Sequence, residues 1–191
     1  GGSELSARRY RRLATPWGYY VNRLACRLAS IFLIGLTGQS LAAMAAESVR
    51  YLAPGKSPVT LDEKALAAMP RMTVQAGAHG DAPSAWEGVA LVEVMRAEGA
   101  PLGKALRGDA LANYVRVTGT DGYQVVFGLG ELDADMGAAK VVLVDRHEGK
   151  PLDEKDGPLR LVVPGDQRPA RWVRNVATIE LLSASTRGPR P

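Results

Sequence analysis

The stretch Gly157-Pro158-Leu159-Arg160-Leu161-Val162-Val163-Pro164-Gly165-Asp166 predicts a buried β-strand that ends in a tight turn. Its centre is apolar and rich in β-branched residues, and the Pro-Gly pair that follows is a turn signal. Four arginines lie in or shortly after this stretch: Arg160, Arg168, Arg171 and Arg174. The guanidinium group presents a planar fork of donors that suits phosphate and other oxyanions. The segment therefore predicts a strand with a candidate anion-binding site beside it.

The same arginines have a second interpretation. Arginines on the outer face of a strand commonly pair with neighbouring acids, here Asp166 and Glu180, and such surface pairs contribute about 0–1 kcal/mol each. The residues leave both interpretations open, and Arg171 is the first choice for an anion contact.

Outward from this stretch, the chain alternates short strand and helix patterns. Strands are expected at residues 71–76, 114–118, 123–127, 141–145, 159–163 and 172–182. Thr60 and Glu63 form a capping box ahead of an apolar helical pattern that Pro70 ends, and a second helix is expected over residues 91–97. Short strands mixed with a few short helices predict an α+β fold, a single domain built on one mixed sheet.

Composition divides the chain into four segments. Residues 1–45 are expected to be a leader, residues 46–58 a linker or first strand, residues 59–183 the folded domain and residues 184–191 a flexible tail. The leader has a basic start, an uncharged apolar run from Leu28 to Ala46 and the small-x-small sequence Ala43-Met44-Ala45, as in a cleaved secretory signal. This pattern predicts a periplasmic or secreted protein cleaved near Ala45. Contact with a membrane is expected only through an uncleaved leader.

Charge and cysteine content exclude several classes of protein. The chain has a formal net charge of +4, but residues 1–45 hold six of its 24 basic residues and one of its 20 acidic residues. The remaining 18 basic and 19 acidic residues give a net charge of about −1, which argues against a nucleic-acid partner. The one cysteine, Cys26, lies inside the leader, so the folded domain is expected to form no disulfide and to offer no thiolate.

The order of motifs over residues 61–182 resembles the molybdopterin-binding domain of sulfite-oxidase-like oxidoreductases, in particular its small exported members. The matching pieces are Trp86-Glu87-Gly88-Val89 before a helix, Asp121-Gly122-Tyr123 before a strand, Phe127 with Glu131-Leu132, Gly149-Lys150-Pro151-Leu152, and the stretch from Gly157 to Pro164 followed by Arg171-Trp172-Val173. The resemblance implies a mixed-sheet fold, a molybdopterin cofactor and two-electron redox chemistry at a molybdenum ion that one protein thiolate ligates.

One position departs from the family pattern. The metal-ligating cysteine normally ends a strand ahead of a small, polar loop, and the residue that best matches it here is Ala76, in Thr73-Val74-Gln75-Ala76-Gly77. A methyl group cannot ligate molybdenum, for which soft thiolate is the usual protein donor. We therefore predict no metal site and a cofactor-poor or catalytically degenerate protein. Any enzymatic activity would be that of a molybdopterin-dependent oxidoreductase.

The expected cofactor-binding residues are Ala76, His79, Trp86, Arg160 and Arg171. His79 follows the degenerate cysteine position, where a solvated loop histidine is the alternative. The resemblance places Arg160 and Arg171 toward the pterin phosphate or a substrate oxyanion. Trp86 is expected either in the core, because it buries a large apolar area, or lining a ligand pocket. His147 is expected in an exposed turn between strands.

Two hypotheses of function follow. In the first, the chain is an exported molybdopterin-binding-domain protein that has lost the metal chemistry. In the second, the same fold serves as a periplasmic binding module without redox activity. That module would bind a small anion or pterin through Arg160 and Arg171, or a redox or signalling partner protein. Since a fold does not determine a function, the resemblance alone does not choose between these hypotheses.

Overall fold

The structure is a computed structural model that describes residues 48–186, except residue 79. The chain divides into two compact units, Gly1–Ser40 and Leu41–Pro191, and every described residue lies in the second. The expected leader at residues 1–45, His79 and residues 187–191 of the expected tail therefore lie outside the described residues. No helix within residues 48–186 is long and apolar enough to span a membrane.

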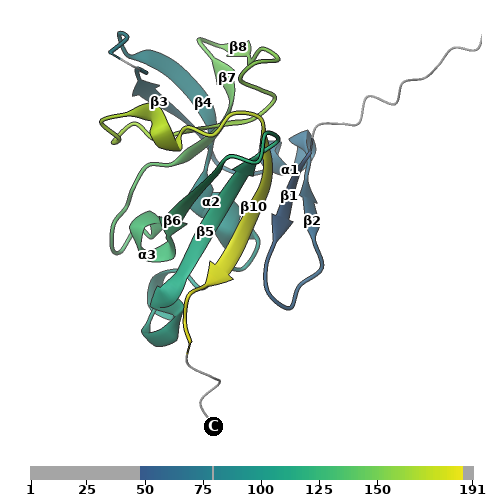
Figure 1. The fold of residues 1–191 in the computed structure, drawn as a ribbon, viewed down its shortest axis with the longest axis vertical. Helices are drawn as coiled ribbons and strands as arrows, with labels where there is room; N and C mark the ends of the chain where they lie inside the picture. The colour runs from purple at the N-terminus through teal and green to yellow at the C-terminus, as the bar shows by residue number, and fades with distance from the viewer. Residues whose placement is uncertain (1–47, 79, 187–191) are drawn as a thin grey trace, which may run out of the picture. The chain divides into compact units, whose positions relative to one another are not determined.

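The first sheet of the described domain has five strands in the order β2-β1-β10-β5-β6 (Figure 1). These strands are β1 (Val49–Leu52), β2 (Val59–Leu61), β5 (Asn113–Gly119), β6 (Gln124–Gly128) and β10 (Val176–Ser183). β1 runs parallel to β10 and the other neighbours pair antiparallel, so the sheet is mixed. The hairpin between β5 and β6 turns at Asp121-Gly122, as predicted, and Gly122 adopts a φ of 82° there.

The second sheet carries the candidate site. It contains β3 (Arg71–Ala76), β4 (Ser84–Ala90), β7 (Val142–His147), β8 (Lys150–Pro151) and β9 (Arg160–Val162). β4 pairs with β3 on one side and with β7 on the other, and all pairings are antiparallel. β8 and β9 share the other edge of β7, because β9 pairs with its first residues and β8 with its last. In Figure 1 the labels of β3, β4, β7 and β8 gather at one end of the domain.

Short helices connect the strands of the described domain. These are α1 (Glu63–Ala67), α2 (Leu91–Ala97), α3 (Leu129–Leu132) and the 3₁₀ turns η1 (Gly103–Ala105), η2 (Gly108–Ala112) and η3 (Pro169–Arg171). The predicted capping box at Thr60 was wrong, because Val59–Leu61 pairs with β1 as a strand. Asp62 caps α1 instead, and its Oδ1 accepts a hydrogen bond from the backbone N–H of Ala65 at 2.8 Å.

The predicted α+β class is confirmed, with a mixed sheet and a few short helices. The strands form two sheets, however, where the sequence predicted one. Alternation of apolar residues identifies a strand but does not say which edge it joins, and that depends on how the apolar faces are covered. Here both sheets bury their apolar faces in one core, which includes Tyr51, Phe127, Leu143 and Ile179.

Asp133, at the end of α3, ties two loops of this domain together. Its carboxylate is 2% exposed and accepts hydrogen bonds from the backbone N–H of Gly103 at 2.7 Å and of Asp135 at 2.9 Å. We expect Asp133→Ala to lower the free energy of unfolding by about 2 kcal/mol, because it leaves two N–H groups without their acceptors. Urea unfolding followed by circular dichroism measures this loss. Asp135→Asn, at an exposed neighbour, should leave the midpoint unchanged, and an equal loss in both variants would contradict the assignment.

Candidate functional site

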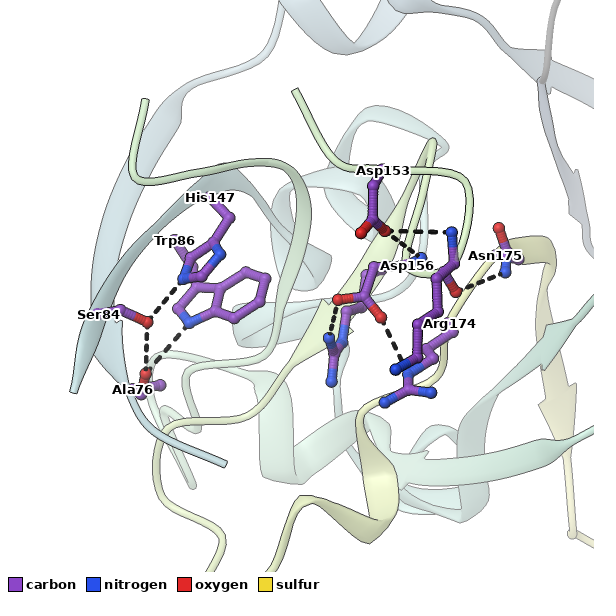
Figure 2. Close-up of polar contacts among 10 residues, drawn as sticks. Ala76, Ser84, Trp86, His147, Asp153, Asp156, Arg174 and Asn175 are labelled. Atoms are coloured by element: carbon purple, nitrogen blue, oxygen red, sulfur yellow. Dashed lines mark hydrogen bonds and ion pairs between the residues drawn. The ribbon is translucent and has the colours of Figure 1, made fainter. Parts of the chain in front are cut away.

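Side chains from β4, β7 and β9, with Trp172 after η3, form a cluster next to Ala76, and Figure 2 shows its members Trp86 and His147. We define this aromatic cluster as Trp86, His147, Arg160 and Trp172. Trp86 lies opposite Val74 of β3 and opposite His147 of β7 in the strand register. The His147 ring stacks on the Trp86 indole with 3.8 Å between ring centroids and 13° between planes, and the Trp172 ring meets Trp86 edge-on at 6.0 Å. Such aromatic pairs add stability beyond the area that they bury.

The backbone of Ala76 is held by this cluster. Its carbonyl oxygen accepts a hydrogen bond from Trp86 Nε1 at 3.1 Å and a longer one from Ser84 Oγ at 3.4 Å. Ser84 Oγ is also 2.7 Å from His147 Nε2, as the dashed lines in Figure 2 show. Ala76 itself is 5% exposed. The end of β3, where the resemblance expects a metal ligand, is therefore a buried methyl group on a backbone fixed by an indole.

Arg160 is the charged member of the cluster and is buried. Its guanidinium carbon lies 5.2 Å from the Trp86 ring and 5.5 Å from the Trp172 ring, and the residue is 5% exposed. Its Nη1 donates to Asp156 Oδ2 at 2.5 Å. Burial lowers the pKa of Arg160, and the Asp156 charge opposes this change. Its Nε is buried and donates no hydrogen bond within the described residues, so one donor of the fork is left without an acceptor.

Asp156 also pairs with a second arginine. Arg174 Nε lies 3.0 Å from Asp156 Oδ1, and Figure 2 shows Arg174 beside this carboxylate. The loop that presents Asp156 is held by Asp153, whose Oδ1 accepts the backbone N–H groups of Lys155 and Asp156 at 3.1 and 3.0 Å. Two guanidinium groups thus share the Asp156 carboxylate, and the nearby Asp153 carboxylate adds a second negative charge that also acts on Arg160.

Arg171 makes its contacts elsewhere. Its Nε and Nη2 donate to the two carboxylate oxygens of Asp166 at 2.9 and 2.6 Å, and its Nη1 donates to Glu131 at 2.9 Å. The guanidinium group also covers the Phe127 ring at 4.7 Å. The hydrogen bonds to Asp166 raise the pKa of Arg171 above its usual range. The structure thus brings Ala76, Trp86 and Arg160 together, whereas Arg171 closes a separate ion-pair network.

The prediction for His147 was wrong. The sequence placed it in an exposed turn, but β7 continues through His147 and the turn begins at Glu148 and Gly149, which adopt φ values of 50° and 73°. His147 is half-buried, and its ring covers Trp86. A period-2 pattern was visible, since Asp145 and His147 both fall on the alternate positions of a strand that starts at Val142. The charged residues at the C-terminal end of β7 made this strand pattern look like a turn.

Comparison with known proteins gives two findings. A family model described as oxidoreductase molybdopterin binding domain matches residues 55–189. The fold is similar to that in the crystal structure of the sulfane dehydrogenase SoxCD from Paracoccus pantotrophus, with a TM-score of 0.52 and 19% sequence identity. That match covers 70% of this chain and 37% of the SoxCD chain, so this protein spans little more than a third of its relative. No curated protein matches the sequence.

Proposed function

Because the chain belongs to the oxidoreductase molybdopterin-binding domain family, we propose that it is a member which binds a ligand without molybdenum redox chemistry. One observation carries this proposal: Ala76 ends β3 as a buried methyl group where the family's thiolate is expected. The only cysteine, Cys26, precedes the region that matches the family. Within the described residues, no group of three or more histidine, cysteine, aspartate or glutamate side chains is placed to hold a metal ion.

The arginines that the resemblance assigns to the cofactor also fit poorly. Arg160 donates to Asp156, and Arg171 donates to Asp166 and Glu131, so each guanidinium group already has a carboxylate partner. An anchored phosphate would have to displace these internal acids. The residues present therefore do not fit a molybdenum cofactor, and no redox step is assigned to them.

The aromatic cluster supports binding of a small planar anion, such as a pterin without its metal. Trp86 is covered by His147 on one ring face, and His147 is the more exposed of the two. A flat ring would extend this stack by lying on His147 or by replacing it. The buried Arg160 Nε supplies a donor that lacks an acceptor, and a carbonyl or carboxylate oxygen would satisfy it. Stacking on aromatic rings and a directed donor are the usual means of holding such a ligand.

Export remains part of this proposal. The basic start, apolar run and Ala43-Met44-Ala45 sequence support secretion to the periplasm. A periplasmic redox or signalling protein is the alternative occupant of the site.

The proposal is tested on the protein purified from its native compartment. Elemental analysis should find no stoichiometric molybdenum. Isothermal titration should then detect binding of pterin-6-carboxylate, which offers both a flat ring and an anion. His147→Ala should lower the affinity for this probe if its ring stacks on His147, and should raise it if the ring replaces His147. Inorganic phosphate serves as the ring-free control and separates simple anion binding from recognition of the ring. Stoichiometric molybdenum in the wild-type protein would overturn the proposal.

Ala76→Cys restores the missing thiol and is the matched variant. We expect it to gain no molybdenum when it is produced with a supply of molybdenum cofactor, because Arg160 and Arg171 remain paired with their own carboxylates. Metal content per folded chain is the measurement. If Ala76→Cys gains stoichiometric molybdenum, the cradle is intact and the loss of one sulfur atom is the sole defect.

A further inference from the structure

β6 forms one edge of the first sheet, next to α3 (Figure 1). It pairs with β5 on one side, and no loop or turn of the described residues makes a backbone–backbone hydrogen bond to residues 124–128. A strand in this position presents a row of backbone donors and acceptors to any further strand that reaches it. Native proteins usually prevent such pairing with a charged side chain, a proline, a bulge or a very short edge strand.

Other edge strands of this domain carry that protection, but β6 does not. β3 begins with Arg71, and β8 consists of Lys150 and Pro151. β2, at the opposite edge of the first sheet, is only three residues long. β6 has five residues, Gln-Val-Val-Phe-Gly, with no charge and no proline, and its pairing with β5 contains no bulge. The edge at β6 is therefore open to strand addition.

Exposed apolar side chains also gather around β6. The described residues include five large ones: Val59, Leu111, Tyr123, Val126 and Met136. Val126 is the central residue of β6 and is 54% exposed, and Tyr123 directly precedes the strand. Leu111 belongs to η2 and Met136 follows α3, and these two short helices contact each other where β6 ends. Exposed apolar side chains concentrated along one sheet edge indicate an interaction site.

The sequence of β6 suits antiparallel pairing with a second copy of itself. Pairing centred on Val126 places Gln124 opposite Gly128 and Val125 opposite Phe127 of the other copy. Opposite residues of an antiparallel pair point to the same face. Val125 and Phe127 are buried and the other three residues are exposed, so the core faces of both copies stay on one side. No like charges meet, because the strand has no charged residue.

Antiparallel pairing also brings together the exposed residues at the two ends of β6. Tyr123 lies at its start, whereas Leu111 and Met136 lie near its end. Tyr123 of each copy would therefore approach Leu111 and Met136 of the other. The Tyr123 hydroxyl donates to the carbonyl oxygen of Ala170 at 2.7 Å, so this half-exposed side chain is already held in place. An isolated peptide strand would offer no such match at both ends, which favours a second copy as the occupant.

We propose that β6 is a self-association edge, through which two copies of this chain pair antiparallel about Val126 and join their first sheets into one continuous sheet. Such a dimer has twofold symmetry, the commonest arrangement of soluble oligomers. The new backbone hydrogen bonds and the burial of Val126 and Tyr123 would stabilise it. This inference does not depend on the proposed function, because no residue of the aromatic cluster belongs to β6.

Sedimentation equilibrium of the purified protein over a concentration series tests the proposal. The wild-type protein should form a reversible dimer. Val126→Lys should weaken dimerisation at least about tenfold, because it places two like charges opposite each other. Val59→Lys is the matched control, since Val59 is an exposed valine of β2 at the other edge of the same sheet, and it should leave dimerisation unchanged.

Circular dichroism establishes that both lysine variants are folded before they are compared. A wild-type protein that stays monomeric at every concentration would overturn the proposal. A dimer that Val126→Lys leaves intact, or that both variants weaken equally, would also overturn it.

A disulfide variant tests the register directly. Directly opposite Cα atoms of an antiparallel pair lie about 4.5–5.5 Å apart, within the range that a disulfide spans. Val126→Cys should therefore form a covalent dimer under mild oxidation, whereas Val59→Cys should not, as a non-reducing gel would show. Cys26→Ser in both variants removes the other thiol of the sequence. A folded Val126→Cys protein that forms no covalent dimer, or Val59→Cys linkage to the same extent, would overturn pairing about Val126.

Discussion

Gly88→Ala is expected to lower the free energy of unfolding by about 3 kcal/mol or more. Gly88 is buried in β4 beside an irregularity in the pairing of β4 with β7. A Cβ atom there would lie 2.0 Å from the carbonyl oxygen of Leu143 and 2.6 Å from the Cα of Val144. Both are backbone atoms of β7, so neither can rotate away as a side chain would. The two strands that present Trp86 and His147 would have to separate.

Urea unfolding followed by circular dichroism measures this effect, and Gly165→Ala is the matched control. Gly165 is exposed, and a Cβ atom built on it has no heavy atom within 4 Å. That substitution should leave stability unchanged or raise it by up to about 1 kcal/mol, because alanine restricts the unfolded chain. A Gly88→Ala protein as stable as the Gly165→Ala protein would contradict the close approach of β4 and β7.

Trp86→Ala should cost about 3–5 kcal/mol of unfolding free energy, the usual range for removal of a large buried aromatic side chain. Trp86 is 5% exposed and contacts every part of the aromatic cluster. Its loss removes the stack with His147, the edge contact with Trp172 and the hydrogen bond to Ala76. It also leaves Arg160 with one aromatic neighbour instead of two.

Trp86→Phe separates the ring from the hydrogen bond. Phenylalanine keeps an aromatic face for His147 but has no N–H for the Ala76 carbonyl, so the expected loss is about 1–2 kcal/mol. Circular dichroism is the appropriate probe, because these substitutions remove a fluorescent indole. If both variants were equally unstable, the hydrogen bond would dominate and the aromatic stack would contribute little.

The Trp86→Phe variant also tests the proposed binding of a planar anion. Trp86→Phe should retain affinity for pterin-6-carboxylate, because His147 and Arg160 keep an aromatic neighbour. A folded Trp86→Phe protein that loses all affinity would argue that binding depends on the hydrogen bond from the indole N–H to the Ala76 carbonyl, and not on the extended stack.

Local pattern predicted much of the fold. β3 and α2 lie at the residues that the sequence indicated, and the β5–β6 hairpin turns at the predicted glycine. These features depend on residues within one turn or one strand of each other. Thr60 failed as a helix cap for the opposite reason, because β2 pairs with β1 and takes that residue into a strand.

In the candidate site, too, some features follow from residue types and others depend on strand pairing. Absence of a thiol at Ala76 and of any cysteine beyond Cys26 follows from residue types alone, since no arrangement of the chain can turn a methyl group into a metal ligand. The sequence also identified Trp86 and Arg160 as candidates. The sequence did not predict the surroundings of these two residues, because Trp86 and Arg160 lie far apart in the chain. They meet only through the pairing of β4 with β7 and of β7 with β9.

Residue types therefore determined that the described part of the chain offers no thiolate, and tertiary structure decided the surroundings of the other candidate groups. Arg160 and Arg171 are alike in sequence, yet one is enclosed between two indoles and the other lies between two carboxylates. His147 changed from a turn residue to a stacking partner when β7 paired with β4. The physical reason is that a side chain's charge and donors are local properties, whereas its burial and its partners depend on strands brought together from distant parts of the chain.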